Sequence, residues 1–559
     1  MYLRTHRSRS AGGQEVEYYY LAHNVRDPST KRSTPKIIHS FGRADELDRD
    51  ELTRLCRSIA RVCGLEVYDP LKEGRKAASD RALPAGVTQV ETWPLGMVWV
   101  IEALWERFGI GEELRRIGRE SKCTVPYERA LLAMTANRLC APRSKLGVWD
   151  RWLETVHMPS CGGLKLPQMY AAMDLLYENA ARVEEAVFFK TADLLNVEVD
   201  VVFYDTTTCS FSIDEEDDED GLRHFGHSKE GTWTAQVVVA LAVTREGLPV
   251  RSWVFPGDTS DVATVETVKK DLRGWKLGRA LFVADSGMNS EDNRQELARA
   301  CGTYLMACRA GSVKEIQAEV LGRPGRYKVI ADNLHVKEVT VGKGVKRRRY
   351  VVCFNPSEAE RQAKHREQVL AEIDETLASH KDDGATSKWA IELMASKRWG
   401  RYLKVGRGSK VIVSQDAIRK AERMDGKWVL MTNDDTLSVE DAATGYKNLL
   451  VIERCFRTMK SAQIQMGPMY HWLPRRIEAH VKICALALLL QRVAELAVGE
   501  PWPRIADSLG HLQATEYQTD SHRFFQRNAV HPEVRRILKK LKIPEPNEVL
   551  RIAPLVENP

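Results

Sequence analysis

The amino-acid sequence predicts an α/β fold in which a core sheet is interrupted by a β-rich insertion. Three observations support this prediction. β-prone runs over residues 197–302 occur in the order of three strands, a helix and a fourth strand. Strand-like runs rich in basic residues fill residues 303–432. Helical patterns lie on both sides of these two stretches.

Composition sets wide limits on the class of protein. The chain has 559 residues, enough for several domains. Its 83 basic and 77 acidic residues give a formal charge of +6, which permits nucleic-acid binding without demanding it. The 11 cysteines show no Cys-x-x-Cys spacing, which favours a reducing cytoplasm over a disulfide framework or a zinc site. The segment at Met1 has no apolar stretch, and the longest apolar run, Ile483–Leu490, is far shorter than the ~20 residues of a membrane span. We therefore expect a cytoplasmic protein with no membrane partner.

The part before the core divides into two stretches. Residues 1–85 are predicted to form a small β/α segment, because short β-prone runs separated by basic turns precede a helical pattern. Residues 86–196 are helical in pattern throughout, and we interpret them as a helical DNA-binding region. A group of basic residues around one turn is compatible with a helix-turn-helix-like module, although other compact bundles have the same pattern. The group consists of Arg138, Arg143, Lys145 and Arg151.

Residues 197–302 form the first part of the predicted core. The run Val201–Thr208 contains Asp205 near its end, and the run Ala280–Ser290 reaches Asp285, so each Asp lies where a buried strand emerges. Three hairpin-connected strands, a helix and a fourth strand are the order of a ribonuclease-H-like core. The first and fourth strands are neighbours in that sheet. The sequence therefore predicts that Asp205 and Asp285 lie close together.

Other acids in this stretch have plainer interpretations. An Asp at a strand end is also a common helix cap or turn former, and this alternative applies to both candidates. Asp258 and Asp261 are rival second acids, but they precede a helix and are interpreted as caps. The acidic run Asp214–Asp220 is interpreted as a solvated hairpin tip.

Residues 303–432 are predicted to form a β-rich insertion. Basic and aromatic side chains alternate there, which suits a surface that follows a DNA backbone and stacks on bases, although solvated hairpin tips have the same composition. Arg348 is a candidate phosphate contact. Trp399, in the basic stretch KRWGRYLK, is the candidate for stacking, although a Trp in a β-domain is more often packed. Trp428 lies in an apolar strand and is predicted to be a core residue.

Residues 433–498 are predicted to complete the core, and residues 499–559 to form a helical tail. The stretch Tyr446–Lys460 has no Gly or Pro, and its apolar residues recur at spacings of three and four, which predicts one amphipathic helix. Tyr446, Glu453 and Lys460 are each two turns apart and project from one edge of that helix. A phenol, a carboxylate and an ammonium in line suit a surface that holds a metal and a phosphate. A solvated charge pair is the alternative.

Taken together, these residues resemble the DDE transposases of bacterial insertion sequences, in the group with a Tyr-x2-Arg-x3-Glu-x6-Lys motif after a β-rich insertion. Tyr446, Glu453 and Lys460 match three of the four fixed positions. Leu449 stands where the family has Arg, and Arg454 or Arg457 is the expected substitute. Further similar segments are YDTT around Asp205, GHSKEG with Lys229, GLPV, FPGDTSD, ADSGM around Asp285, and HSFGRADEL near the N-terminus.

The resemblance implies cleavage of DNA at the ends of the insertion sequence and joining of those ends to target DNA. The partners would be the terminal inverted repeats and the target duplex, bound by a homodimer in the bacterial cytoplasm in association with the nucleoid. Two Mg²⁺ or Mn²⁺ ions per site would be held by carboxylates, because hard oxygen ligands select these metals. Asp205 would bridge the ions, and Asp285 and Glu453 would each complete one shell. The expected DNA or phosphate contacts are Tyr446, Lys460, Arg457, Lys229, Arg348 and Trp399.

Two other functions remain open at this point. A ribonuclease-H-like nuclease that cuts without joining would use the same three acids. A domesticated DNA-binding protein without catalysis is the alternative that is not an enzyme, and the presence of all three acids argues against it.

Overall fold

The chain divides into two compact units, Met1–Val87 and Thr88–Pro559. The computed structural model describes residues 2–9, 15–26, 33–43, 83, 86–122, 124–197, 199–273, 275, 281–300, 302–309, 316–344, 347–380, 384–461 and 463–554. The division lies next to the boundary expected after residue 85.

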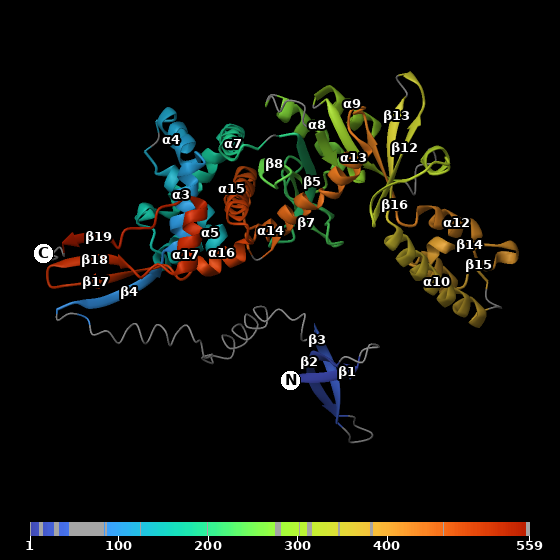
Figure 1. Cartoon of the computed structure of the whole chain (residues 1–559), viewed down its shortest axis with the longest axis horizontal. Coiled ribbons are helices and arrows are strands. Elements are labelled where there is room, and N and C mark those ends of the chain that lie inside the picture. The colour runs from blue at the N-terminus through green and yellow to red at the C-terminus, as the bar shows by residue number, and fades with distance from the viewer. Residues whose placement is uncertain are drawn as a thin grey trace. The chain divides into compact units, whose positions relative to one another are not determined.

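The first unit contains an antiparallel sheet in the order β1-β2-β3 (Figure 1). Its central strand is rich in Tyr and Val, which favour β-strands. The strands are β1 (Tyr2–Arg9), β2 (Glu15–Arg26) and β3 (Ser33–Arg43). The helix predicted for this segment lies outside the described residues.

The second unit begins with a strand, β4 (Thr88–Pro94), and then becomes helical. Its helices before the core are α3 (Gly96–Arg107), α4 (Ile110–Glu120), α5 (Tyr127–Cys140) and α7 (Leu166–Leu195). A helix from much later in the chain, α15 (Pro474–Val498), packs against α5 and α7. Most of its side chains are buried, so α15 is the central helix of this region. In the part of the chain that the structure describes, no helix is both long and apolar enough to cross a bilayer.

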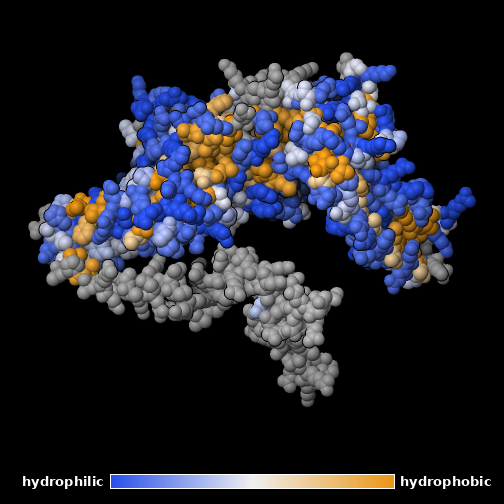
Figure 2. All heavy atoms as spheres, viewed as in Figure 1, coloured by the Kyte–Doolittle hydropathy of each residue, from blue (hydrophilic) through white to orange (hydrophobic). Residues whose placement is uncertain are grey.

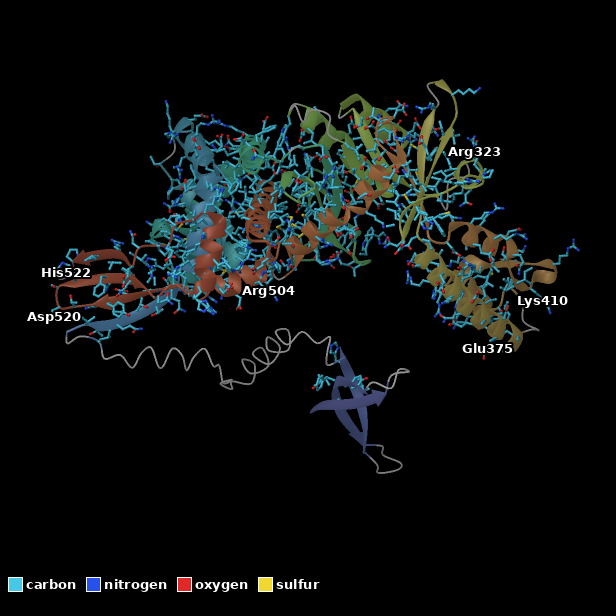
Figure 3. The ribbon with its side chains drawn as sticks, viewed as in Figure 1. Arg323, Glu375, Lys410, Arg504, Asp520 and His522 are labelled. Carbon is cyan, nitrogen blue, oxygen red and sulfur yellow. The ribbon has the colours of Figure 1, made fainter. Side chains whose placement is uncertain are left out.

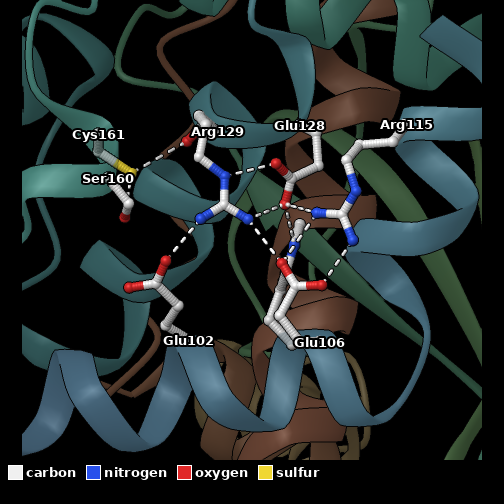
Figure 4. A network of polar contacts seen from close by, with 8 residues as sticks. Glu102, Glu106, Arg115, Glu128, Arg129, Ser160 and Cys161 are labelled. Atoms are coloured by element: carbon white, nitrogen blue, oxygen red, sulfur yellow. Dashed lines mark hydrogen bonds and ion pairs between the residues drawn. The ribbon is translucent and has the colours of Figure 1, made fainter. Parts of the chain in front are cut away.

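A partly buried polar network joins α3 to α5 (Figure 4). Arg129 of α5 pairs with Glu102 at 2.5 Å and with Glu106 at 2.7 Å, and both acids lie on α3. Trp105 is fully buried and donates its indole N–H to Glu128 at 2.6 Å. Polar contacts in both directions between α3 and α5 therefore fix the relative position of the two helices.

One mixed sheet of ten strands lies at the centre of the second unit (Figure 1). Its order is β11-β12-β13-β16-β10-β9-β5-β7-β6, and β8 pairs with β7. β5 pairs in parallel with β9 and antiparallel with β7, and β9 pairs in parallel with β10. The core strands are β5 (Val201–Ser210), β6 (His224–His227), β7 (Trp233–Val243), β8 (Pro249–Pro256), β9 (Leu281–Ala284) and β10 (Thr303–Cys308).

Helices cover both faces of this sheet, and the side chains alternate between them. Phe203 and Val283 belong to the cluster that includes α14 and α15, whereas Tyr204 and Phe282 belong to the cluster that includes α8 and α9. The covering helices are α8 (Asp261–Arg273), α9 (Glu291–Ala300), α13 (Val439–Lys447) and α14 (Leu450–Lys460). On the visible face, apolar residues gather over α7 and α15, and polar residues dominate α4 (Figure 2).

The insertion differs from the prediction of a β-rich subdomain over residues 303–432. β10 is a core strand, and the strands that follow extend the same sheet because β16 pairs with β10 and β13 pairs with β16. These strands are β11 (Lys328–Ala331), β12 (Leu334–Val341), β13 (Arg348–Phe354) and β16 (Lys427–Thr432). The prediction of a separate β-rich body was therefore wrong, because strand-like sequence does not reveal which edge a strand joins.

The part of the insertion with its own core is mainly helical. Val369, Ile373, Leu393 and Tyr402 are buried together there. Glu375 and Lys410 mark this part in Figure 3. Its elements are α10 (Pro356–Ser379), α11 (Lys388–Ala395), β14 (Leu403–Val405), β15 (Val411–Val413) and α12 (Gln415–Met424).

The tail also differs from its prediction. Residues 499–559 contain α16 (Trp502–Leu509) and α17 (Pro532–Leu541), but they also contain strands. These are β17 (Gln513–Gln518), β18 (His522–Arg527) and β19 (Val549–Pro554). They form a sheet with β4 in the order β19-β18-β17-β4. The prediction of a helical tail was wrong because the partner of β17 lies at the far end of the unit, beyond the reach of local pattern.

Candidate active site

Asp205 lies on the central strand β5, just beyond the point where β9 stops pairing with it. The parallel register ends with Tyr204 opposite Ala284. Asp205 is half-buried, and its Oδ1 accepts a hydrogen bond from the Thr206 N–H at 2.7 Å. Successive side chains alternate along a strand, so Asp205 follows Phe203 on the face covered by α14.

Asp285 is the first residue after β9. Since Ala284 pairs with Tyr204, Asp285 takes the next position beside Asp205 on the neighbouring strand. Parallel strands lie about 4.8 Å apart. Asp285 then begins a short turn, Ser286–Met288, in which the Met288 N–H donates to the Asp285 carbonyl at 3.2 Å. The end of β9 therefore leaves the Asp285 side chain exposed beside the more buried Asp205.

Tyr446 reaches this pair of acids from α13. Its hydroxyl donates to Asp285 Oδ1 at 2.9 Å. Burial and the negative charge of Asp285 raise the pKa of this hydroxyl, and the charges of Asp205 and Glu453 add to the rise. Tyr446 therefore stays protonated and lies within electrostatic range of all three acids.

Glu453 and Lys460 lie on α14, whereas Tyr446 lies on the preceding helix. The sequence predicts one helix over Tyr446–Lys460, but α13 ends at Lys447 and α14 begins at Leu450. The junction tightens into hydrogen bonds of the 3₁₀ type, such as Leu449 N–H to the Tyr446 carbonyl at 2.9 Å. The prediction of one continuous helix was wrong. The spacing of seven residues survives, but Tyr446 no longer projects along the same line as the other two residues.

Lys460 lines a small cavity of ≈ 310 Å³. Its ammonium group donates to Thr207 Oγ1 at 3.2 Å and forms an ion pair with Glu230. Glu230 follows Lys229, so the loop after β6 brings both residues to this end of the sheet. The cavity beside Lys460 is lined mainly by hydroxyl and backbone groups, with Thr208, Ser228 and Gly467 among them.

Asp261, at the start of α8, belongs to this site as well. Its Oδ1 accepts from Thr206 Oγ1 at 2.5 Å, and its Oδ2 accepts from Lys229 Nζ at 2.9 Å. A Cβ at Gly287 would lie 3.2 Å from Asp261 Oδ2, so the carboxylate lies against the turn that follows Asp285. From the sequence, Asp261 is interpreted as a helix cap. Its place in the site becomes visible only in the fold, where it lies beside Lys229.

The electrostatics at Asp205 follow first from its burial and then from the charges around it. Burial raises the pKa of Asp205 to about 6. The Thr206 N–H and the charge of Lys229 oppose the rise, whereas the charges of Asp285 and Asp261 add to it. A cation placed here would therefore relieve a repulsion that one lysine does not cancel.

The chemistry of the carboxylates at this site, rather than a preformed cluster, suits a hard divalent cation. Carboxylate oxygens are the ligands that Mg²⁺ and Mn²⁺ prefer. Among the described residues, no group of three His, Cys, Asp or Glu side chains stands close enough together to hold a metal ion. Asp205 and Asp285 occupy adjacent positions, and Glu453 projects as an exposed side chain from the helix that packs on β5.

The remaining predicted contacts lie elsewhere. Arg457 and Arg454 line a different cavity from Lys460, one of ≈ 540 Å³ beside residues 499–503. Leu449 is buried, at 7% exposure, so the position where the resemblance leads us to expect Arg is part of the core. Arg348 pairs with Glu291 at 2.8 Å near the start of α9.

Trp399 and Trp428, the two tryptophans of the insertion for which the sequence makes a prediction, are both packed. Trp399 lies against the core of α10 and α11, and its indole N–H donates to Glu372 at 3.3 Å. The structure therefore favours the packed alternative for Trp399 over base stacking, because its polar edge and part of its ring are already occupied. Trp428 packs against the main core, as its apolar strand predicts.

Comparison with known proteins identifies similar sequences for both units. Residues 202–490, more than half of the chain, match the family model of the transposase DDE domain, and residues 3–69 match that of the IS1634 family transposase N-terminal domain. The curated proteins contain no match. One similar solved structure is a piggyBac transposase synaptic complex with hairpin DNA, with a TM-score of 0.33 and 10% identity over 74% of this chain and 78% of that chain.

Proposed function

Because the chain belongs to the family of transposases with a DDE domain, we propose that it cleaves the ends of its own insertion sequence and joins them to target DNA. The reaction is hydrolysis of a phosphodiester followed by attack of the freed 3′-hydroxyl on a second phosphodiester. The single observation that carries this proposal is the pairing of Tyr204 with Ala284, because it gives Asp205 and Asp285 adjacent positions on neighbouring parallel strands.

Asp205, Asp285 and Glu453 are the proposed ligands of Mg²⁺ or Mn²⁺, with two ions per site. The raised pKa of Asp205, which burial causes and neighbouring carboxylates increase, supports this assignment. Bound ions would activate the attacking oxygen and stabilise the leaving oxygen. Glu453 lies on α14, which packs on β5. The third carboxylate therefore comes from the helices that cover the sheet, whereas Asp205 and Asp285 come from β5 and the end of β9.

The basic and phenolic groups position the DNA in this proposal. Lys460 exchanges its partner Glu230 for a phosphate, since it is half-buried and already lies beside Thr207. Tyr446 holds Asp285 in place through its hydrogen bond of 2.9 Å. Lys229 balances the charge of Asp261 and Asp205, and its exposed side chain is available for a second phosphate.

The proposed catalytic core is ribonuclease-H-like. The order β8-β7-β5-β9-β10, with β9 and β10 parallel to β5, supports this classification. The proposed partner is duplex DNA bound by a homodimer. Contacts from Arg348 and Arg457 would lie outside the immediate surroundings of the acids, because these residues face Glu291 and residues 499–503.

The test is an assay with the purified protein, Mg²⁺, a duplex carrying the ends that flank its coding sequence, and a target plasmid. Asp205→Asn, Asp285→Asn and Glu453→Gln should each abolish cleavage and joining while end binding persists. Asp193→Asn, at an exposed acid on α7, is the matched control and should behave as the wild type. Cleavage without joining by the wild type would identify a nuclease, and full activity in the three variants would overturn the proposed site.

A further inference from the structure

A large cavity lies between the helical region and the segment that follows α14. Its volume is ≈ 550 Å³. Arg138 and Lys145 line it from the end of α5 and the turn after it, and Tyr470, His471 and His480 line it from the other side. None of these residues belongs to the site formed by Asp205 and Asp285.

Two cations are buried in the wall of this cavity. Lys145 is 4% exposed and Arg138 is 5% exposed. Among the described residues that line the cavity, none is an Asp or Glu. Asp174 lies nearby, but it pairs with Arg475 and Arg476 at the start of α15. The two buried charges therefore have no carboxylate of their own.

The partners of these cations are neutral. Lys145 Nζ lies 2.5 Å from His480 Nδ1, and His480 Nε2 lies 3.0 Å from the Met466 carbonyl oxygen. Nε2 thus donates to the carbonyl, and Nδ1 accepts from the ammonium group. Burial, with the nearby charge of Arg138, lowers the pKa of Lys145 to about 7.

Arg138 is held in the same way by neutral acceptors. Its guanidinium group donates to the Gln465 carbonyl at 3.1 Å and to the Ile464 carbonyl at 3.4 Å. Burying a charge is unfavourable unless an opposite charge compensates it. An anion in the cavity would compensate both cations at once, and their hydrogen bonds hold them in place for it.

The mouth of the cavity has further groups that suit a nucleic-acid strand. Arg143 is exposed and lines the cavity beside the two buried cations. Tyr470, at 63% exposure, lines the cavity and offers an aromatic face. Trp472, two residues further on, is 58% exposed and lies against the Arg223 guanidinium group. Basic groups interleaved with exposed aromatic rings are the surface that single strands and distorted ends contact.

The cavity adjoins the region of the acids through one segment. Gly467 lines both this cavity and the smaller one beside Lys460. Met469 is bonded to the end of β5, because its N–H donates to the Ser210 carbonyl at 2.8 Å and its carbonyl accepts from the Ser212 N–H at 3.0 Å. The strand that carries Asp205 therefore also anchors the wall of the cationic cavity.

We propose that this cavity binds a phosphate group of the DNA strand that is cleaved, at a position displaced along the strand from the scissile bond. This inference rests on the proposed function, since it assigns a second contact to the same substrate. Lys145 and Arg138 neutralise the phosphate, and Arg143 contacts the strand at the entrance. Lys460 holds the strand between this cavity and the acids.

The first test is Lys145→Met, which removes the charge and keeps a chain of similar length. Affinity for a duplex carrying the element's ends should fall about tenfold, as for loss of a hydrogen bond to a charged group, and the salt dependence of binding should weaken by about one phosphate contact. Thermal stability of the free protein should be unchanged or higher, because an uncompensated buried cation is gone. Lys539→Met, at an exposed lysine on α17, is the matched control. It should leave the affinity, the salt dependence and the thermal stability unchanged.

The second test places single methylphosphonates along the strand. A methylphosphonate at one position should weaken binding of the duplex by the wild type. The same methylphosphonate should have no further effect on binding by Lys145→Met. Arg143→Gln, an exposed change, provides the same comparison if Lys145→Met fails to fold. The inference would be overturned if the wild type cleaves the ends but every methylphosphonate affects the wild type and both variants equally. The proposed function would then remain intact.

A third arm separates DNA from a free anion. Inorganic phosphate could raise the melting temperature of the wild type but not of Lys145→Met. If no methylphosphonate position is coupled to the variant as well, the cavity binds a small anion and the DNA proposal is overturned. A wild-type protein that neither binds nor cleaves the ends would overturn the proposed function itself.

Discussion

The surroundings of Asp205 raise the pKa of its carboxyl group from the ordinary value of 3.8 to about 6, and burial is the main cause. Between about pH 4 and pH 6 the folded protein holds a proton that the unfolded chain has released. The stability this proton gives is fully present below about pH 4 and is lost as the pH rises through about 6. Asp205→Asn should remove this dependence and stabilise the metal-free protein at about pH 7.5 by roughly 1–3 kcal/mol.

Thermal unfolding in a chelating buffer at about pH 4 and about pH 7.5 measures this effect. Mg²⁺ added at the higher pH should then raise the melting temperature of the wild type and leave that of Asp205→Asn unchanged, since ligands stabilise the state that binds them. Parallel pH profiles for the two proteins would contradict the prediction.

Lys460 and Glu230 form a pair whose members should respond in opposite directions. Glu230 occupies the ammonium group that a DNA phosphate is proposed to take. Glu230→Gln should therefore maintain or strengthen binding to end DNA, whereas Lys460→Ala should weaken it about tenfold, as for loss of a charge-assisted bond. Filter binding at several salt concentrations measures both, and equal losses in the two variants would show that the pair acts only as a structural contact.

At the scale of elements, the junction between α13 and α14 decides which residues reach the acids. Leu449 lies at this junction with 7% exposure, at the position where the resemblance leads us to expect Arg. Leu449→Arg should therefore not create a phosphate contact, because the new charge would enter the core. Unfolding in urea should show a loss of about 2–4 kcal/mol. Leu450→Arg, at the exposed neighbour, is the control and should lower stability far less.

The helical part of the insertion leaves and rejoins the sheet at one place. The Asn355 N–H donates to the Gly426 carbonyl at 2.7 Å, so the two ends of this part are already in contact. Replacing residues 356–425 with a short Gly linker should leave the core folded, because its own cluster of buried residues is removed whole. Circular dichroism and thermal unfolding check this, and aggregation of the shortened protein would contradict it.

Across the whole molecule, the sequence is most informative where local patterns occur in the order of a known sheet. We could predict the strands at Val201 and Ala280 from their local pattern. Their order then places Asp205 beside Asp285. The break at Leu449 could not be predicted, since 3₁₀ tightening leaves the apolar pattern intact. The sheet of β4 with β17 could not either, because the polar and apolar residues of these two strands are mixed and resemble those of a turn-rich tail.

The pairing of β4 with β17 also affects the order in which the protein is made. Thr92 and Thr515, whose hydroxyls lie 3.0 Å apart, are separated by 423 residues in the chain. A ribosome adding ~5–20 residues per second needs about 20–80 s between the two. During that time β4 is an unpaired strand, and its exposed polar side chains disfavour pairing with another chain. The ten-stranded sheet, whose last strand in the chain is β16, is thus synthesised in full before β17 lets this terminal sheet close.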